Sequence, residues 1–144
     1  MKRSKEKIAE ALRHAHHALL RDLRRLQDVA RPGSDVTLIE LRTLLSETYT
    51  HLCEHFRWEE QDGYLDELDE AEPRFQRVVQ ELGEEHRELR RTLDDLHGDT
   101  ILASTVDPAL LANIRNWIDR LRRHEARENS LVEDAVTSDL ASAD

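Results

Sequence analysis

Apolar residues recur at alternating spacings of three and four along four long stretches of this chain. That spacing places them on one face of an α-helix and is typical of helices that pack together in a bundle. Glycine and proline are scarce and lie mostly between these stretches, near residues 32, 73, 98 and 108. The sequence therefore predicts four helices, at about residues 4–29, 36 to 65 or 68, 73–96 and 108–136.

Several residues mark the expected helix ends. Ser4 and Asp107 are the predicted N-caps of the first and fourth helices. Pro73 and Pro108 suit first helical positions, where a missing N–H costs nothing. The segment 97–99, His-Gly-Asp, is predicted to end the third helix.

Two residue patterns each occur once in either half of the chain. His16 and His86 both begin the pattern His-x-x-Leu-x-x-x-Leu. His55 and His124 both begin His-x-x-x-Glu, and nearly the same length of chain separates the members of each pair. Such repetition indicates two copies of one helix hairpin. We predict an all-α fold, an up-down-up-down four-helix bundle of two pseudo-symmetric hairpins over residues 1–136, with a flexible tail at 137–144.

Composition narrows the classes of partner. The formal net charge is −10, whereas nucleic-acid binders usually carry a basic face. No stretch approaches the length of about 20 apolar residues that a membrane span needs. The single cysteine, Cys53, permits no internal disulfide, and no secretory signal is visible. We expect a cytoplasmic monomer or weak homo-oligomer that binds neither nucleic acid nor membrane.

The line of apolar residues along one face of each predicted helix is called its stripe below. Each stripe also contains one histidine, and in two stripes a glutamate follows the histidine by four residues. The six residues are His16, His55, Glu59, His86, His124 and Glu128. Burial of so many polar groups without compensation would cost many kcal/mol. Metal ions would compensate by turning the groups into ligands, and six ligands suit two ions rather than one tetrahedral zinc. Imidazole with carboxylate suits iron, manganese or zinc, and bundle cores are known to hold di-iron and di-manganese sites.

These residues resemble the hemerythrin HHE cation-binding family over about residues 8–136. The resemblance rests on His16 with Leu19 and Leu23, His55-Phe56 with Glu59-Glu60, Glu85-His86 with Leu89, and His124 with Glu128. It implies a four-helix bundle around a non-haem di-iron centre in which Glu59 and Glu128 bridge the ions. By the same resemblance, His16 and His55 complete the coordination of one iron, and His86 and His124 complete that of the other.

The chain departs from the oxygen-carrying members of that family at two positions. Leu82 stands where they have a further histidine, and Glu128 stands at His+4 where they have an aspartate at His+5. One histidine fewer leaves a coordination position for water, a small ligand or a nearby side chain. This favours sensing of oxygen, peroxide, nitric oxide or iron, or a modest redox activity, over simple reversible oxygen storage.

Three other interpretations remain open at this point. The same centre could act as a redox enzyme on oxygen, peroxide or nitric oxide, although the sequence shows no substrate pocket. An iron-dependent regulatory module and a metal-free structural bundle are the other interpretations. The sequence assigns no role to Tyr49, His51, Cys53 or Tyr64, and His51 is expected to be exposed.

Overall fold

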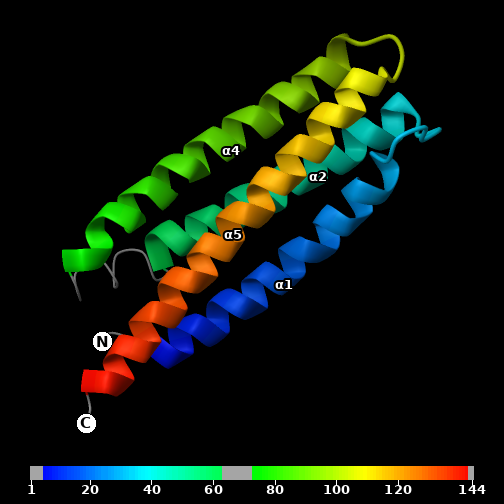
Figure 1. Ribbon diagram of the computed structural model, residues 1–144. Helices are drawn as coiled ribbons and strands as arrows, with labels where there is room; N and C mark the ends of the chain where they lie inside the picture. Colours follow the sequence, from blue (N-terminus) through cyan, green and yellow to red (C-terminus); the bar gives the residue numbers. More distant parts are fainter. Residues whose placement is uncertain (1–4, 63–72, 143–144) are drawn as a thin grey trace.

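The computed structural model describes residues 5–62 and 73–142, and that part of the chain is helical without a strand. Its long helices are α1 (Lys5–Val29), α2 (Leu38–Arg57), α4 (Gln76–Leu102) and α5 (Pro108–Ser142). A π-helix, η1 (Trp58–Asp62), continues α2, and a short 3-10 helix, η2 (Pro73–Phe75), leads into α4. Figure 1 shows the long helices side by side in alternating directions. The predicted all-α, up-down-up-down bundle is confirmed.

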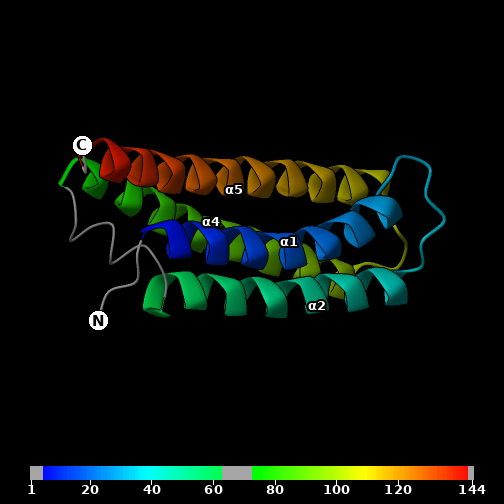
Figure 2. The same cartoon turned by 90° about the horizontal axis from the view of Figure 1, so that it is seen from below.

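Each long helix packs against two others. α1 lies against α2 and α5, and α4 lies against the same two helices, so the four enclose one central core. Figure 2 shows this arrangement from below, with α1 beginning at the end of the bundle where α5 finishes. All of the leucine stripes therefore face the same interior, as amphipathic helices require.

The core contains two apolar clusters, which lie on either side of a polar level. The larger fills the end of the bundle with the turn after α1 and the α4–α5 connection, and includes Leu23, Leu45, Leu93, Ile114 and Trp117. The smaller lies at the opposite end and includes Ile8, Leu12, Phe75, Leu82 and Leu131.

Hydrogen bonds join neighbouring helices in the larger apolar region. The Trp117 indole donates to the Leu89 carbonyl at 3.0 Å, and Arg115 donates to the Ala30 carbonyl at 2.6 Å. Arg42 donates twice to the Thr100 carbonyl, at 2.7 and 2.9 Å. These bonds use side chains of one helix to satisfy backbone carbonyls of another, which fixes the register of the bundle.

Several predicted helix ends are confirmed. α1 ends at Val29, and Gly33 takes a left-handed φ of 75° in the turn that follows. Asp107 caps α5, since its Oδ1 accepts a hydrogen bond from the Ala109 N–H at 3.0 Å. Ser4, the predicted cap of the first helix, lies outside the described residues, as does the predicted end of the second helix. Tyr64 lies outside them too.

The predicted end of the third helix at 97–99 is wrong, because α4 continues to Leu102. Gly98 does not take a positive φ, so it acts as an ordinary helical residue at a cost of about 1 kcal/mol relative to alanine. Thr100 is fully buried, and Arg42 of α2 binds its carbonyl, so tertiary contacts hold the last turn in place. α5 likewise runs past the expected end at Val136, to Ser142, while flexibility of the tail stays a prediction.

Candidate metal centre

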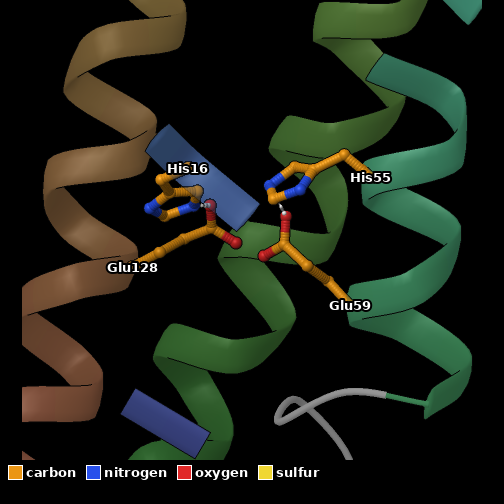
Figure 3. Close-up of side chains that lie close together, drawn as sticks. All are labelled: His16, His55, Glu59 and Glu128. Carbon is orange, nitrogen blue, oxygen red and sulfur yellow. Dashed lines mark hydrogen bonds and ion pairs between the residues drawn. The ribbon is translucent and has the colours of Figure 1, made fainter. Parts of the chain in front are cut away.

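The polar level between the apolar clusters is formed by the six residues that the stripes single out. They are His16 of α1, His55 of α2, Glu59 of η1, His86 of α4, and His124 and Glu128 of α5. None of their side chains is more than 7 % exposed. Figure 3 shows four of them: His55 and Glu59, on one continuous stretch of helix, face His16 and Glu128 across the core. The helical stripes thus bring all six together.

Glu128 contacts histidines from three helices. Its Oε1 lies 3.2 Å from Nε2 of His16 and 3.2 Å from Nε2 of His124. Its Oε2 lies 3.3 Å from Nε2 of His86. Glu59 approaches from the other side, with Oε1 2.7 Å from Nε2 of His55 and 3.9 Å from Nε2 of His86. The two carboxylates therefore lie between the four imidazoles.

The donor atoms form two groups that share one residue. His16, His55, Glu59 and Glu128 make the first group, and His86, His124 and Glu128 make the second. Within each group all the donor atoms lie within 4.8 Å of one another. A carboxylate that belongs to both groups is placed as a bridging ligand would be.

The spacing of the donor atoms fits a metal ion. Two ligands about 2.1 Å from an ion and at right angles to each other are about 3 Å apart. The contacts of Glu128 and Glu59 with the histidines, at 2.7–3.9 Å, lie around that value. The buried Nε2 atoms of His55 and His124 face carboxylates without the geometry of a hydrogen bond. Such nitrogens suit coordination better than hydrogen bonding, so these residues fit a metal.

The pKa shifts give His55 and Glu128 the protonation states that metal ligands need. Burial, together with the neighbouring His16, lowers the pKa of His55 to about 3, so its imidazole is neutral. Burial opposes the ionised form of Glu128, but its close contacts with Glu59, His124, His16 and His86 outweigh burial and hold the pKa of Glu128 well below its usual value. Burial opposes charge on His124, but Glu128 and Glu85 beside its ring outweigh burial and raise the pKa of His124 above its usual value, so a bound cation would take the place of a proton there.

Three of the histidines are oriented by a side chain bound to Nδ1. His86 Nδ1 lies 2.9 Å from Glu60 Oε1, and His124 Nδ1 lies 2.8 Å from Glu85 Oε1. His16 Nδ1 lies 3.1 Å from the amide oxygen of Asn129. Such partners fix the ring so that Nε2 faces inward, which is how ligating histidines are usually held.

From the sequence, Glu60 and Glu85 adjoin ligands and are candidates for orienting ligand imidazoles, but nothing in it shows which histidine each one binds. Each binds the histidine of another helix, so the pairing depends on the register between helices. Asn129 was missed for the same reason. Glu125 was also missed, although it is only 5 % exposed and its Oε1 has no hydrogen-bond partner among the described residues. Burial raises the pKa of Glu125 to about 7.

The other polar residues discussed from the sequence lie away from the donor groups. His51 is exposed, as expected, and pairs with Asp22 at 2.6 Å. Tyr49 and the half-buried Cys53 interact with each other, and a hydrogen bond with the thiol raises the pKa of Tyr49. Tyr64 is outside the described residues.

A groove of about 650 Å³ lies beside the first donor group. Ala15 and Asp22 of α1 line one side, and His51, His55 and Trp58 line the other. His55 is thus both a member of the donor cluster and part of the groove wall. No other predicted ligand lines this groove.

The fold and the site together define a four-helix bundle with a buried His/Glu cation site. The profile of the hemerythrin HHE cation-binding domain matches residues 7–136, and the chain belongs to that family. The resemblance noted in the sequence is thereby confirmed, and so is metal binding as the family's general property. No curated protein and no solved structure matches the chain significantly.

No helix in the described part of the chain is both long enough and apolar enough to cross a membrane.

Proposed function

We propose that this protein holds two iron ions in the buried His/Glu cluster and uses them to bind or sense oxygen, peroxide or nitric oxide. The observation that carries the proposal is Glu128, a fully buried carboxylate shared by two donor groups. Glu59 and Glu128 would bridge the ions. His16 and His55 would hold one ion, and His86 and His124 the other. Manganese or zinc would also suit these ligands.

Iron bound here would supply redox chemistry and a coordination position for a small ligand. The chain's own residues would keep bulk water from this centre and fix its geometry. Phe56 is fully buried and stacks on the His86 ring at 3.8 Å between centroids. Leu82, also fully buried, provides an apolar side chain where oxygen carriers have a histidine. The centre would therefore have four histidines within a largely apolar wall.

A di-iron redox enzyme is the second candidate, and the groove beside His55 favours it. A small oxidant or reductant could approach the first donor group there, which the sequence alone did not suggest. Turnover of peroxide or nitric oxide would separate an enzyme from a sensor. Cytoplasmic location, the monomeric or weakly oligomeric state and the absence of nucleic-acid partners stay predictions.

The first test is the metal content and ultraviolet–visible spectrum of protein purified from iron-supplemented cells. We expect about two irons per chain and near-ultraviolet charge-transfer bands of a bridged centre. Oxygen, peroxide and nitric oxide should then perturb those bands. A protein without bound metal, whose thermal stability does not change in Glu59→Ala, would mean that the six residues form only a polar core.

A further inference from the structure

We infer that the two metal positions are unequal, and that the ion at His16 and His55 is released before the ion at His86 and His124. This rests on the proposed function, because it needs an ion in each donor group. The evidence is a break in the internal symmetry of the chain. The break affects the residues that hold the histidines. Each half of the chain supplies the same types of predicted ligand, although Glu59 belongs to the first donor group alone.

The first difference is the partner of the leading histidine in each half. Glu60 directly follows Glu59, and Asn129 directly follows Glu128, so the two occupy equivalent positions of the repeat. Glu60 binds His86 Nδ1 at 2.9 Å, and Asn129 binds His16 Nδ1 at 3.1 Å. The contact is thus preserved between the halves. A carboxylate holds His86, however, and a neutral amide holds His16.

The second difference is the partner of the histidine in each His-x-x-x-Glu motif. Glu85 precedes His86 and binds His124 Nδ1 at 2.8 Å. Its counterpart in the first half is Ala15, which precedes His16 and has no side chain that could bind His55. Within the described residues no hydrogen bond holds His55 Nδ1. Ala15 and His55 instead both line the groove between α1 and α2.

A carboxylate bound to Nδ1 makes an imidazole a stronger donor, and losing such a partner typically weakens metal binding by about 10- to 100-fold. Both carboxylates of the His86–His124 pair are themselves held by arginines. Glu85 pairs with Arg127, and Glu60 lies 3.9 Å from Arg90. The partners of His86 and His124 are therefore charged and fixed.

Ring packing is closer at the same position, because the Trp58 ring that stacks on His55 lies 6.2 Å from it, whereas Phe56 lies 3.8 Å from His86. Phe56 stacks on His86 with an interplanar angle of 9°, and its ring meets the His124 ring edge-on at 5.6 Å. His86 and His124 are thus covered as well as hydrogen-bonded. The side chain of His55 is the most exposed of the six, at 7 %, and borders the groove. A chelator or water would reach the His16–His55 position first.

The experiment is the release of iron from the full chain, loaded anaerobically with ferrous iron and mixed with a coloured ferrous chelator. We expect two phases of about one iron each, with rates that differ by about 10-fold or more. Asn129→Asp, and separately Ala15→Glu, should slow the fast phase about 10-fold or more and leave the slow phase unchanged. The groove leaves space for the longer side chain at position 15.

The reverse variants are Glu60→Gln and Glu85→Gln. Each should speed the slow phase by about 10-fold or more without changing the fast one. Glu88→Gln is the matched control, because Glu88 is an exposed α4 carboxylate whose described ion pair is with Arg120. It should leave both phases unchanged.

The outcomes separate this inference from the function on which it rests. If the wild-type chain binds no iron, the proposed function fails. If it binds two irons and releases them in one phase, the positions are equal and the inference fails alone. The inference also fails if Glu60→Gln or Glu85→Gln speeds both phases equally, or if neither Asn129→Asp nor Ala15→Glu slows the fast phase.

Discussion

The larger apolar cluster, called the apolar half below, and the level of the six His and Glu residues are built from the same helical stripes. They hold the helices together in opposite ways. Near the loops, the stripes carry leucines, each of which contributes about 1.5–3 kcal/mol when buried. One or two turns further along, the same stripes carry imidazoles and carboxylates, whose burial costs free energy unless they are paired. The apolar half therefore stabilises the fold without any ligand, and we expect the polar level to become stabilising when a cation binds.

Among the variants proposed here, Glu128→Ala at the polar level is expected to change metal content and stability the most. Because Glu128 belongs to both donor groups, the variant should lose both ions. It should also lose the stabilisation that bound metal gives, about 4 kcal/mol at a thousand-fold excess over the dissociation constant. Metal analysis and melting curves with and without iron measure both. Glu133→Ala, an exposed site on α5, is the control, and two irons per chain in Glu128→Ala would contradict the shared-ligand arrangement.

Leu45→Ala in the apolar half is expected to lower stability while metal content stays unchanged. Leu45 is fully buried, so the cavity should lower the free energy of unfolding by about 2–5 kcal/mol. Iron per chain should not change, because Leu45 lies ten residues, about 15 Å of helix, from His55. Denaturant unfolding and metal analysis test this. Ile39→Ala, on a side chain 73 % exposed, should change neither quantity, and loss of metal in Leu45→Ala would show that the two regions are coupled.

A smaller effect is expected from Glu125→Gln in the metal-free protein. Burial raises the pKa of Glu125 from its usual 4.5 to about 7, so the folded state holds a proton that the unfolded state has lost. Stability should therefore fall as the pH rises from about 4.5 to 7, and the loss should persist above that range. The variant should remove this decline and be more stable at pH 8 by roughly 1–3 kcal/mol.

The measurement for Glu125 is urea unfolding of chelator-treated protein between pH 5 and pH 8. Glu133→Gln, at an exposed carboxylate of the same helix, should leave the pH dependence as in the wild type. Equal slopes for wild type and Glu125→Gln would mean that Glu125 is ionised at no cost in the folded protein.

The smallest effect is expected from Gly98→Ala in α4. A Cβ at this position would meet no atom within 4 Å, and the backbone φ is not positive. Alanine should therefore stabilise the apolar half by about 0.5–1 kcal/mol without changing iron binding. Thermal melting of the iron-free and iron-loaded forms checks this. A loss of stability would mean that this turn of α4 needs the freedom of glycine after all.

The sequence predicted the architecture and the six buried polar residues because both follow from the spacing of side chains along single helices. The leucine stripes set the number and direction of the helices. The position of His55 and Glu59 one turn apart placed both on the inner face. Such information is local, so it can be read without knowing how the helices meet.

The remaining features depend on contacts between helices. α4 continues through Gly98 because Arg42 binds the carbonyl of Thr100, which no local pattern shows. The spacing of apolar residues along the second helix does not indicate the π-helix at Trp58–Asp62. The roles of Asn129 and Ala15 become visible only when α1 is placed beside α2 and α5.

The contact between His16 and Glu128 joins residues 112 positions apart, near opposite ends of the chain. Because both donor groups contain Glu128, neither is complete until α5 has been synthesised and has packed against α1. A growing chain would therefore hold neither donor group complete before α5 has been made. In the function proposed above, iron can consequently fill both positions only after α5 has been made, so the timing of the iron supply would decide how much of the protein is loaded.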